Sequence, residues 1–271
     1  MWVVVRGKKE IILFLLIFLS LFFFIFLMCN RHTEKHYTVL RDAIIRGDSM
    51  RKEIALVFTG GDFSDGGRHI QCVLDQERVS AGFFFTGDFY RNEANQALIE
   101  QLVRDGHYLG PHSDRHLLYC SWENRDSLLV TKDEFRQDML ANYAEMERFG
   151  ITKNNTPFFI PPYEWHNETI VQWAEELNLV LFNMSPGTLS HADYTTPDMP
   201  NYRDSKRIYW SILDYEKEHK NGLNGFILLI HIGSHPDRTD KFYKLLAPLI
   251  GELKTRDYQF KRIDRLIGKR K

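Results

Sequence analysis

Short runs of apolar residues recur along this chain, separated by longer stretches in which apolar residues follow helical spacing. Short runs of this kind are typical of strands that are buried inside a sheet. The predicted strands lie at residues 54–58, 81–86, 108–110, 156–165, 179–183, 225–231 and 258–263. Consecutive prolines end the fourth of these runs.

Helical patterns alternate with the predicted strands. The predicted helices lie at residues 68–78, 92–104, 131–149, 207–219 and 240–254. The third helix begins with Thr131 and carries Glu134 three residues later, which is the spacing of a capping box. Strands that alternate with helices in this way predict an α/β fold.

Residues 11–29 differ from the rest of the chain because they are apolar or small and include no charged residue. The run approaches the ~20 residues that a helix needs to cross a ~30 Å hydrocarbon core. Arg6, Lys8 and Lys9 precede it, so the positive-inside rule predicts a cytoplasmic N-terminus. We expect a membrane-anchored protein whose folded domain lies outside the cytoplasm, in the periplasm or at the cell surface.

Two processed forms compete with a retained anchor. A cleaved signal peptide would release a secreted domain, although the run lacks a small-x-small cleavage site. A lipid on Cys29 would instead give a lipoprotein. The predicted organisation is therefore a membrane anchor or signal segment at residues 1–30, a linker at 31–51 and a folded domain at 52–271.

The composition fits one globular domain with an extension. The chain has 271 residues, of which 44% are hydrophobic and 26% are charged. Its formal net charge of −1 gives no basic surface for a nucleic acid, so we expect no nucleic-acid partner.

Two histidines stand four residues apart in Gly110-Pro-His-Ser-Asp-Arg-His116, directly after the strand at 108–110. If this segment forms one helical turn, His112 and His116 lie on the same face and can share one divalent metal ion. In α/β proteins, ligand sites gather at the C-terminal ends of the strands. The pair therefore predicts a metal site at this end of the sheet.

A glycine-rich loop at 59–67 follows the strand at 54–58 and contains Asp62 and Asp65. Two imidazoles need a hard anionic partner to complete a metal site, and either carboxylate can supply it. Asp62 is favoured because it lies closer to the end of the strand. The alternative is that both are ordinary turn residues, since Asp beside Gly is a common turn pair.

The stretch Gly106-His-Tyr-Leu-Gly-Pro-His-Ser-Asp-Arg-His116 resembles the His-Ser/Thr-x-x-His motif of the NodB-homology polysaccharide deacetylases, carbohydrate esterase family 4. The resemblance implies a distorted (β/α) barrel of about seven strands. It also implies a metal held by two histidines and one aspartate, and hydrolysis of acetyl groups on a carbohydrate.

Two further motifs support the resemblance. The ending Leu229-Ile-His231 matches the family's Leu-x-His motif, which implies that His231 is the general acid. Pro162-Tyr163 matches the end of the Arg-x-Pro-Tyr motif, which implies that the backbone N–H of Tyr163 binds the oxyanion. The segment 192–194 matches an Asp-x-x-Asp-Trp motif only in part, and a structural loop explains it equally well.

The first motif departs from the family. Where the family has Thr-Phe-Asp-Asp-Gly, with a base followed by a metal ligand, this chain has Thr59 and Gly60 at the two aspartate positions. An alignment on Phe63-Ser-Asp-Gly66 keeps only the second aspartate. The arginine that orients the base is replaced by Ile160. The general base therefore stays open among Asp62, Asp65 and Glu164, the last of which can instead cap the following helix.

Aromatic side chains in loops supply a surface on which sugar rings can stack. Trp122, Tyr163 and Trp165 are the candidates for substrate binding, although aromatic residues in loops also act as packing caps.

The sequence thus predicts a metal-dependent carbohydrate deacetylase that uses Zn²⁺, or Ni²⁺ or Co²⁺ in its place, on Asp62, His112 and His116. The predicted catalytic residues are His231, Asp62 and Glu164, and the predicted partners are an acetylated carbohydrate and a membrane. One alternative is a glycan-binding protein of the cell envelope that no longer hydrolyses. Another is a glycosidase that uses Asp62 and Glu164 as its carboxylate pair.

Overall fold

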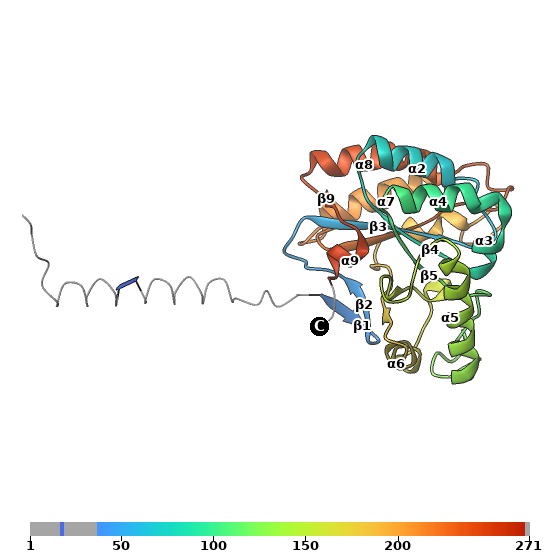
Figure 1. Ribbon diagram of the computed structural model, residues 1–271. Helices are drawn as coiled ribbons and strands as arrows, with labels where there is room; N and C mark the ends of the chain where they lie inside the picture. The colour runs from blue at the N-terminus through green and yellow to red at the C-terminus, as the bar shows by residue number, and fades with distance from the viewer. Residues whose placement is uncertain (1–16, 19–36, 269–271) are drawn as a thin grey trace, which may run out of the picture. The chain divides into compact units, whose positions relative to one another are not determined.

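The computed structural model describes residues 17–18 and 37–268 (Figure 1). The predicted anchor or signal segment therefore lies outside the described part, apart from Ile17 and Phe18. Within the described residues, no helix combines the length and the apolar character that a membrane crossing requires.

The main sheet is built around strand β3 (Glu53–Gly60). On one side β3 pairs in parallel with β8 (Phe226–His231), and on the other with β4 (Gly82–Phe85) and, at its first residues, β9 (Gln259–Phe260). Strand β5 (Tyr108–Pro111) continues the sheet in parallel beyond β4.

Two strands near the start of the folded domain extend the sheet beyond β8, on the side away from β4 and β5. β2 (Ala43–Arg46) pairs antiparallel with β8, and β1 (Thr38–Leu40) forms a hairpin with β2. Residues 43–45 are buried. The folded domain therefore begins before residue 52, and the second half of the predicted linker at 31–51 is wrong. Ala43 and Ile44 pair with Leu40 and Val39 of β1, and Arg46 pairs with Phe226 of β8, so neighbouring strands rather than local spacing fix this strand.

A separate two-stranded sheet bends the structure into a curve. β6 (Phe158–Phe159) pairs in parallel with β7 (Val180–Leu181), and a parallel bridge between Ile44 and Phe182 joins this sheet to β2. The Tyr108 hydroxyl accepts a hydrogen bond of 2.8 Å from the Phe158 N–H, so a side chain links β5 to β6. The result is a curled, mixed sheet, which confirms the predicted α/β class.

Helices flank the curled sheet, and in Figure 1 α2, α4, α7 and α8 lie at the top of the view while α5 and α6 lie at the bottom. The α-helices are α2 (Gly67–Gln76), α3 (Gly87–Arg91), α4 (Gln96–Arg104), α5 (Lys132–Glu147), α6 (Glu168–Glu176), α7 (Ser205–Glu218), α8 (Leu246–Thr255) and α9 (Ile263–Leu266). Short 3-10 turns are η1 (Glu93–Asn95), η2 (Pro162–Glu164), η3 (Ser190–Tyr194) and η4 (Phe242–Leu245).

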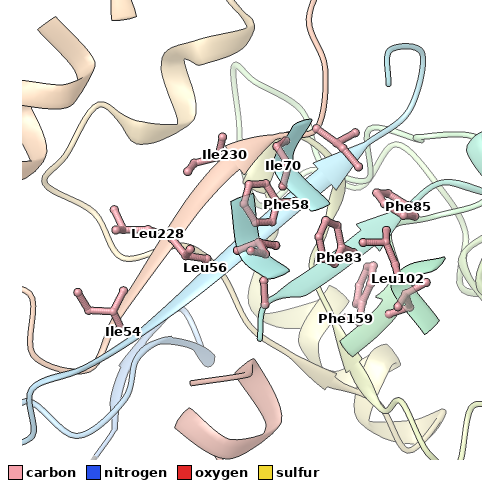
Figure 2. Close-up of a cluster of buried hydrophobic side chains, with 14 of the residues drawn as sticks. Ile54, Leu56, Phe58, Ile70, Phe83, Phe85, Leu102, Phe159, Leu228 and Ile230 are labelled. Carbon is pink, nitrogen blue, oxygen red and sulfur yellow. The ribbon is translucent and has the colours of Figure 1, made fainter. Parts of the chain in front are cut away.

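The core explains why β3 reads as a continuous apolar run. Leu56 and Phe58 face one cluster of buried side chains, whereas Ala55 and Val57 face a second cluster on the other side of the sheet. Figure 2 shows Phe58 beside Phe83, and their ring centroids lie 5.0 Å apart. Because both faces are buried, the strand carries no polar side chain between Ile54 and Phe58. Polar side chains that could bind a ligand are therefore confined to the loops at its end.

The capping box predicted at the start of α5 is confirmed. The Thr131 hydroxyl accepts a hydrogen bond from the Glu134 N–H at 3.2 Å, and the Glu134 carboxylate accepts one from the Thr131 N–H at 2.6 Å. Two N–H groups that the helix cannot pair internally are thereby satisfied.

We expect Thr131→Ala to lower the free energy of unfolding by about 1 kcal/mol, because it removes the oxygen that caps α5. Thr131→Ser keeps that oxygen and is expected to retain wild-type stability. Urea unfolding followed by circular dichroism measures both variants. Equal loss of stability in Ala and Ser variants would contradict the role of the cap.

Candidate active site

A cavity of about 1150 Å³ opens at the C-terminal ends of the parallel strands. Its walls are formed by loops that follow β3, β4, β5 and β8, together with η2 and η3. Every residue predicted for the site lines this one cavity, namely Asp62, His112, His116, Trp122, Tyr163, Glu164, Trp165 and His231. Asp65, the competing aspartate, is not among the lining residues.

The two histidines meet, but not on a helix. The centroids of the His112 and His116 rings lie 5.0 Å apart. The backbone between them is a loop in which Ser113 has φ 70° and His116 has φ 55°, both in the left-handed region. The predicted helical turn is therefore wrong, and left-handed residues bring the two rings together instead.

Polar side chains of α5 explain why this loop avoids a helix. Asn142 accepts a hydrogen bond of 2.9 Å from the His112 N–H, and Asp138 accepts 3.1 Å bonds from the N–H groups of Asp114 and Arg115. The backbone donors that a helix would use are thus committed to side chains. Asp138 and Asn142 are buried and four residues apart, so they face the loop from one side of α5. Sequence reasoning missed both, although two polar residues on the inner face of an amphipathic helix are a recognisable signal.

Both histidines of the pair are suited to bind a metal ion as neutral imidazoles. His112 Nδ1 lies 2.9 Å from the Ile160 carbonyl oxygen, so Nδ1–H donates and Nε2 keeps its lone pair. Burial, followed by the charge of His116, lowers the pKa of His112 well below its ordinary value. Burial also lowers the pKa of His116 to about 4. Metal ligands must be deprotonated, and both imidazoles meet this condition at neutral pH.

The two aspartates of the glycine-rich loop differ in their surroundings. Asp62 lines the cavity, and its negative charge acts on His116. Asp65 accepts hydrogen bonds from the Ser234 N–H at 2.9 Å and from the Tyr243 hydroxyl at 3.1 Å, and it pairs with Lys241 at 3.0 Å. Asp65 therefore ties the loop to the segment after β8.

The donor set of two imidazoles and the Asp62 carboxylate fits a divalent metal ion in its chemistry. In the described part of the chain, no three such side chains already converge on one point. Asp62 stands two residues after the end of β3 and lines the same cavity as the two histidines.

The last residue of β3, Gly60, has no room for a side chain. A Cβ atom on Gly60 would lie 2.7 Å from Ile232 Cγ2 and 2.9 Å from Phe85 Cδ1. Real Cβ atoms do not approach carbon atoms so closely, so the neighbouring side chains have closed the space. The Thr59 hydroxyl is buried and has no hydrogen-bond partner among the described residues. Neither Thr59 nor Gly60 therefore supplies a carboxylate to the cavity.

His231 is held by a carboxylate. Its Nδ1–H donates to Asp193 Oδ1 at 2.7 Å, and its backbone N–H donates to Asp193 Oδ2 at 2.9 Å. Burial opposes the charged imidazole, but the charges of Asp193 and Glu164 outweigh it and raise the pKa of His231. Asp193 was predicted only through the partial motif at 192–194, and its contact with His231 gives that segment a role.

Tyr163 and Glu164 are both in the left-handed region, with φ values of 58° and 53°. Left-handed residues other than glycine cost about 1–3 kcal/mol each and cluster at functional sites. Asn183 holds this backbone, because its Nδ2 donates to the Glu164 carbonyl oxygen at 2.7 Å. Burial, with a smaller contribution from Asp193, raises the pKa of Glu164 to about 7 despite the opposing charge of His231. A carboxyl group in this state can exchange a proton at neutral pH.

An aromatic row, His116–Tyr163–Trp122–Trp165, lines one wall of the cavity. Successive ring centroids lie 4.4, 5.6 and 5.1 Å apart. Trp122 is 55% exposed and Tyr163 is 45% exposed, so both present ring surface to a ligand. The row leads outward from the histidine pair and offers stacking faces to a chain of sugar rings.

Comparison with known proteins supports the resemblance. Residues 46–182, just over half of the chain, match the sequence profile of the polysaccharide deacetylase family. The peptidoglycan N-acetylmuramic acid deacetylase of Bacillus subtilis (strain 168) is 27% identical over 227 residues, which cover 83% of this chain and 75% of that protein.

Solved structures share the fold at lower identity. A peptidoglycan N-acetylglucosamine deacetylase has a TM-score of 0.65 and 22% identity, covering 82% of this chain and 91% of that chain. A family 4 pseudoenzyme from Bacillus anthracis has a TM-score of 0.63 and 18% identity, covering 84% and 70% respectively. With the motif at His112 and His116, these matches show that the chain belongs to the polysaccharide deacetylase family, carbohydrate esterase family 4.

Proposed function

We propose that this protein is a metal-dependent hydrolase that removes acetyl groups from a carbohydrate. The observation that carries the proposal is that the neutral pair His112 and His116, the Asp193-bound His231 and Glu164 all face one cavity beside an aromatic wall. A metal-dependent hydrolase of acetyl groups needs a metal site, a proton donor and a proton acceptor within reach of one bound sugar.

His112, His116 and Asp62 are the proposed metal ligands, for Zn²⁺ or, in its place, Co²⁺ or Ni²⁺. When bound, such an ion polarises the acetyl carbonyl and lowers the pKa of water. His112 is oriented for this role by the Ile160 carbonyl, and the surrounding loop is fixed by Asp138 and Asn142. Outer contacts of this kind set the tautomer and direction of ligating imidazoles.

In the proposed reaction, Glu164 accepts a proton from the attacking water, whose oxygen forms a bond to the acetyl carbon. The backbone N–H of Tyr163 donates to the oxyanion that develops, which one such donor stabilises by on the order of 3 kcal/mol. His231 then gives its Nε2 proton to the departing amine or alkoxide as the bond to the acetyl group breaks. Glu164 is the preferred base because its backbone strain and raised pKa are both properties of functional groups.

A second candidate function is glycan binding without hydrolysis. The observation that favours it is the closed space at Gly60 and the absence of a carboxylate at Thr59, which remove the family's aspartate pair. The aromatic row and the cavity would then hold the carbohydrate without turning it over.

The hydrophobic run at 11–29 and the preceding basic residues support a place for the folded domain outside the cytoplasm. Membrane attachment through this segment would bring the cavity near the glycans of the cell envelope.

Acetate release from the tetramer of N-acetylglucosamine tests the proposed function directly. We expect release with added Zn²⁺ and its loss after treatment with a chelator. Acetate formed at the same rate after complete metal removal would contradict the mechanism. Binding of the tetramer without acetate would favour the second candidate, and new reducing ends without acetate would indicate a glycosidase.

Asp62→Asn is expected to weaken Zn²⁺ binding because it replaces an anionic oxygen ligand with a neutral one. The loss should reach at least the ~10-fold that removal of an outer-shell partner typically costs. Asp65→Asn is the matched control, and we expect it to keep the metal affinity within about threefold since Asp65 does not face the cavity. Isothermal titration calorimetry measures both. The opposite order would move the ligand to Asp65, and equal affinities would exclude both residues.

The pH profile of kcat/KM tests the two proton-transfer groups. Glu164 must be deprotonated to act as base, so activity should fall as the pH drops through about 7. His231 must be protonated, so activity should fall again above its raised pKa.

Glu164→Gln is expected to lower kcat by ~10²–10⁴-fold and to remove the fall on the acidic side. Glu147→Gln, on the exposed face of α5, is the control and should leave the profile unchanged. An acidic fall that persists in Glu164→Gln would assign the base to another residue.

A further inference from the structure

The cation Arg125 lies next to Trp165, the last ring of the aromatic row. The guanidinium carbon of Arg125 lies 3.7 Å from the centroid of the Trp165 ring, and Arg125 Nε donates to the His166 carbonyl oxygen at 2.6 Å. Asn167 Nδ2 in turn donates to the Arg125 carbonyl oxygen at 3.0 Å. Arg125 is therefore held in one place at the wall of the cavity.

Arg125 differs from the other arginine of the cavity in its pairing. Arg115 lies 3.2 Å from a carboxylate oxygen of Asp114 and 3.5 Å from one of Asp88. Within the described part of the chain, Arg125 forms no ion pair. Its two terminal nitrogens donate no hydrogen bond there, since its one side-chain hydrogen bond comes from Nε.

The acidic groups around Arg125 are already engaged. Asp126 and Glu168 both pair with Arg41, at 3.7 and 3.3 Å. Burial, followed by the positive charge of Arg41, lowers the pKa of Arg125. A charge that is partly desolvated and repelled by a neighbour is compensated when a ligand supplies an anion.

A purely structural role does not account for this charge. The bond from Nε and the stacking on Trp165 already fasten the loop at 117–131 to the segment after η2, and neither contact needs the two terminal nitrogens. Those nitrogens form a planar fork that matches the two oxygens of a carboxylate. One unpaired guanidinium also balances the single charge of one carboxylate.

We propose that Arg125 binds the carboxylate of an acidic sugar, so that the substrate is an anionic glycan rather than a neutral one. This rests on the proposed function of the same cavity. Trp122, which is 55% exposed, supplies the stacking face for the charged sugar. Tyr163 and Trp122 separate it from His116, so the acidic sugar is a different unit from the one that loses its acetyl group. The carboxylate can belong to the lactyl ether of muramic acid or to a hexuronic acid.

Calorimetric titration of the full chain with three tetrasaccharides tests this inference. One is the neutral N-acetylglucosamine tetramer, one alternates N-acetylglucosamine with N-acetylmuramic acid, and one alternates N-acetylglucosamine with glucuronic acid. At low salt, we expect at least one carboxylated tetramer to bind about tenfold more tightly than the neutral one, as a charge-assisted hydrogen bond provides.

Arg125→Gln should abolish this preference and change the affinity for the neutral tetramer by less than about threefold. Arg207→Gln removes a positive charge from the exposed face of α7, outside the cavity, and should keep the preference. The carboxylated tetramer that shows the preference identifies the source of the carboxylate.

Equal binding of all three tetramers by the wild type would overturn the inference, as would a preference that survives in Arg125→Gln. A variant that loses affinity equally for all three would also overturn it, because Arg125 would then only support Trp165. Acetate release measured in parallel separates the two proposals. Charge-dependent binding without acetate keeps this inference and refutes the hydrolase, whereas acetate release without charge preference does the reverse.

Discussion

The parallel pairing of β3 with its neighbours is the constraint on which the site depends. Its register places Thr59 opposite His231 of β8, while β4 and β5 continue the same edge as far as Pro111, directly before His112. Because the carboxyl ends of parallel strands meet at one edge, residues far apart in the chain arrive at one cavity. Both faces of β3 are buried, so its apolar side chains pack against other elements on each side of the sheet.

The backbone that surrounds this edge is held in costly conformations by buried polar contacts. Asp138 and Asn142 fix the loop of the histidine pair, and Asn183 fixes the left-handed turn at Glu164. Side-chain acceptors and donors of this kind compensate for backbone groups that no strand or helix satisfies. Four of the nine non-glycine residues with positive φ in the described chain lie at this edge, namely Ser113, His116, Tyr163 and Glu164.

The electrostatics of the cavity divide its histidines into two kinds. Burial keeps His112 and His116 neutral, whereas Asp193 favours the charged form of His231. Two opposing effects set the pKa of Glu164: burial raises it and the charge of the neighbouring His231 lowers it. The chain has no carboxylate at Thr59 or Gly60, whereas the Glu164 carboxyl group lies on a different wall of the cavity.

The sequence by itself determined the alternation of strands and helices, the cap at Thr131 and eight of the residues around the cavity, because these depend on local spacing and short motifs. It misjudged residues 43–45, whose strand is fixed by pairing with β1 and β8, and the turn at His112, whose backbone is set by α5. Only the tertiary structure showed that Asp65 is bonded away from the cavity that Asp62 lines, and that Arg125 forms no ion pair in the described chain. Each of these depends on contacts between residues distant in sequence, and burial, pairing and pKa follow from such contacts rather than from residue type.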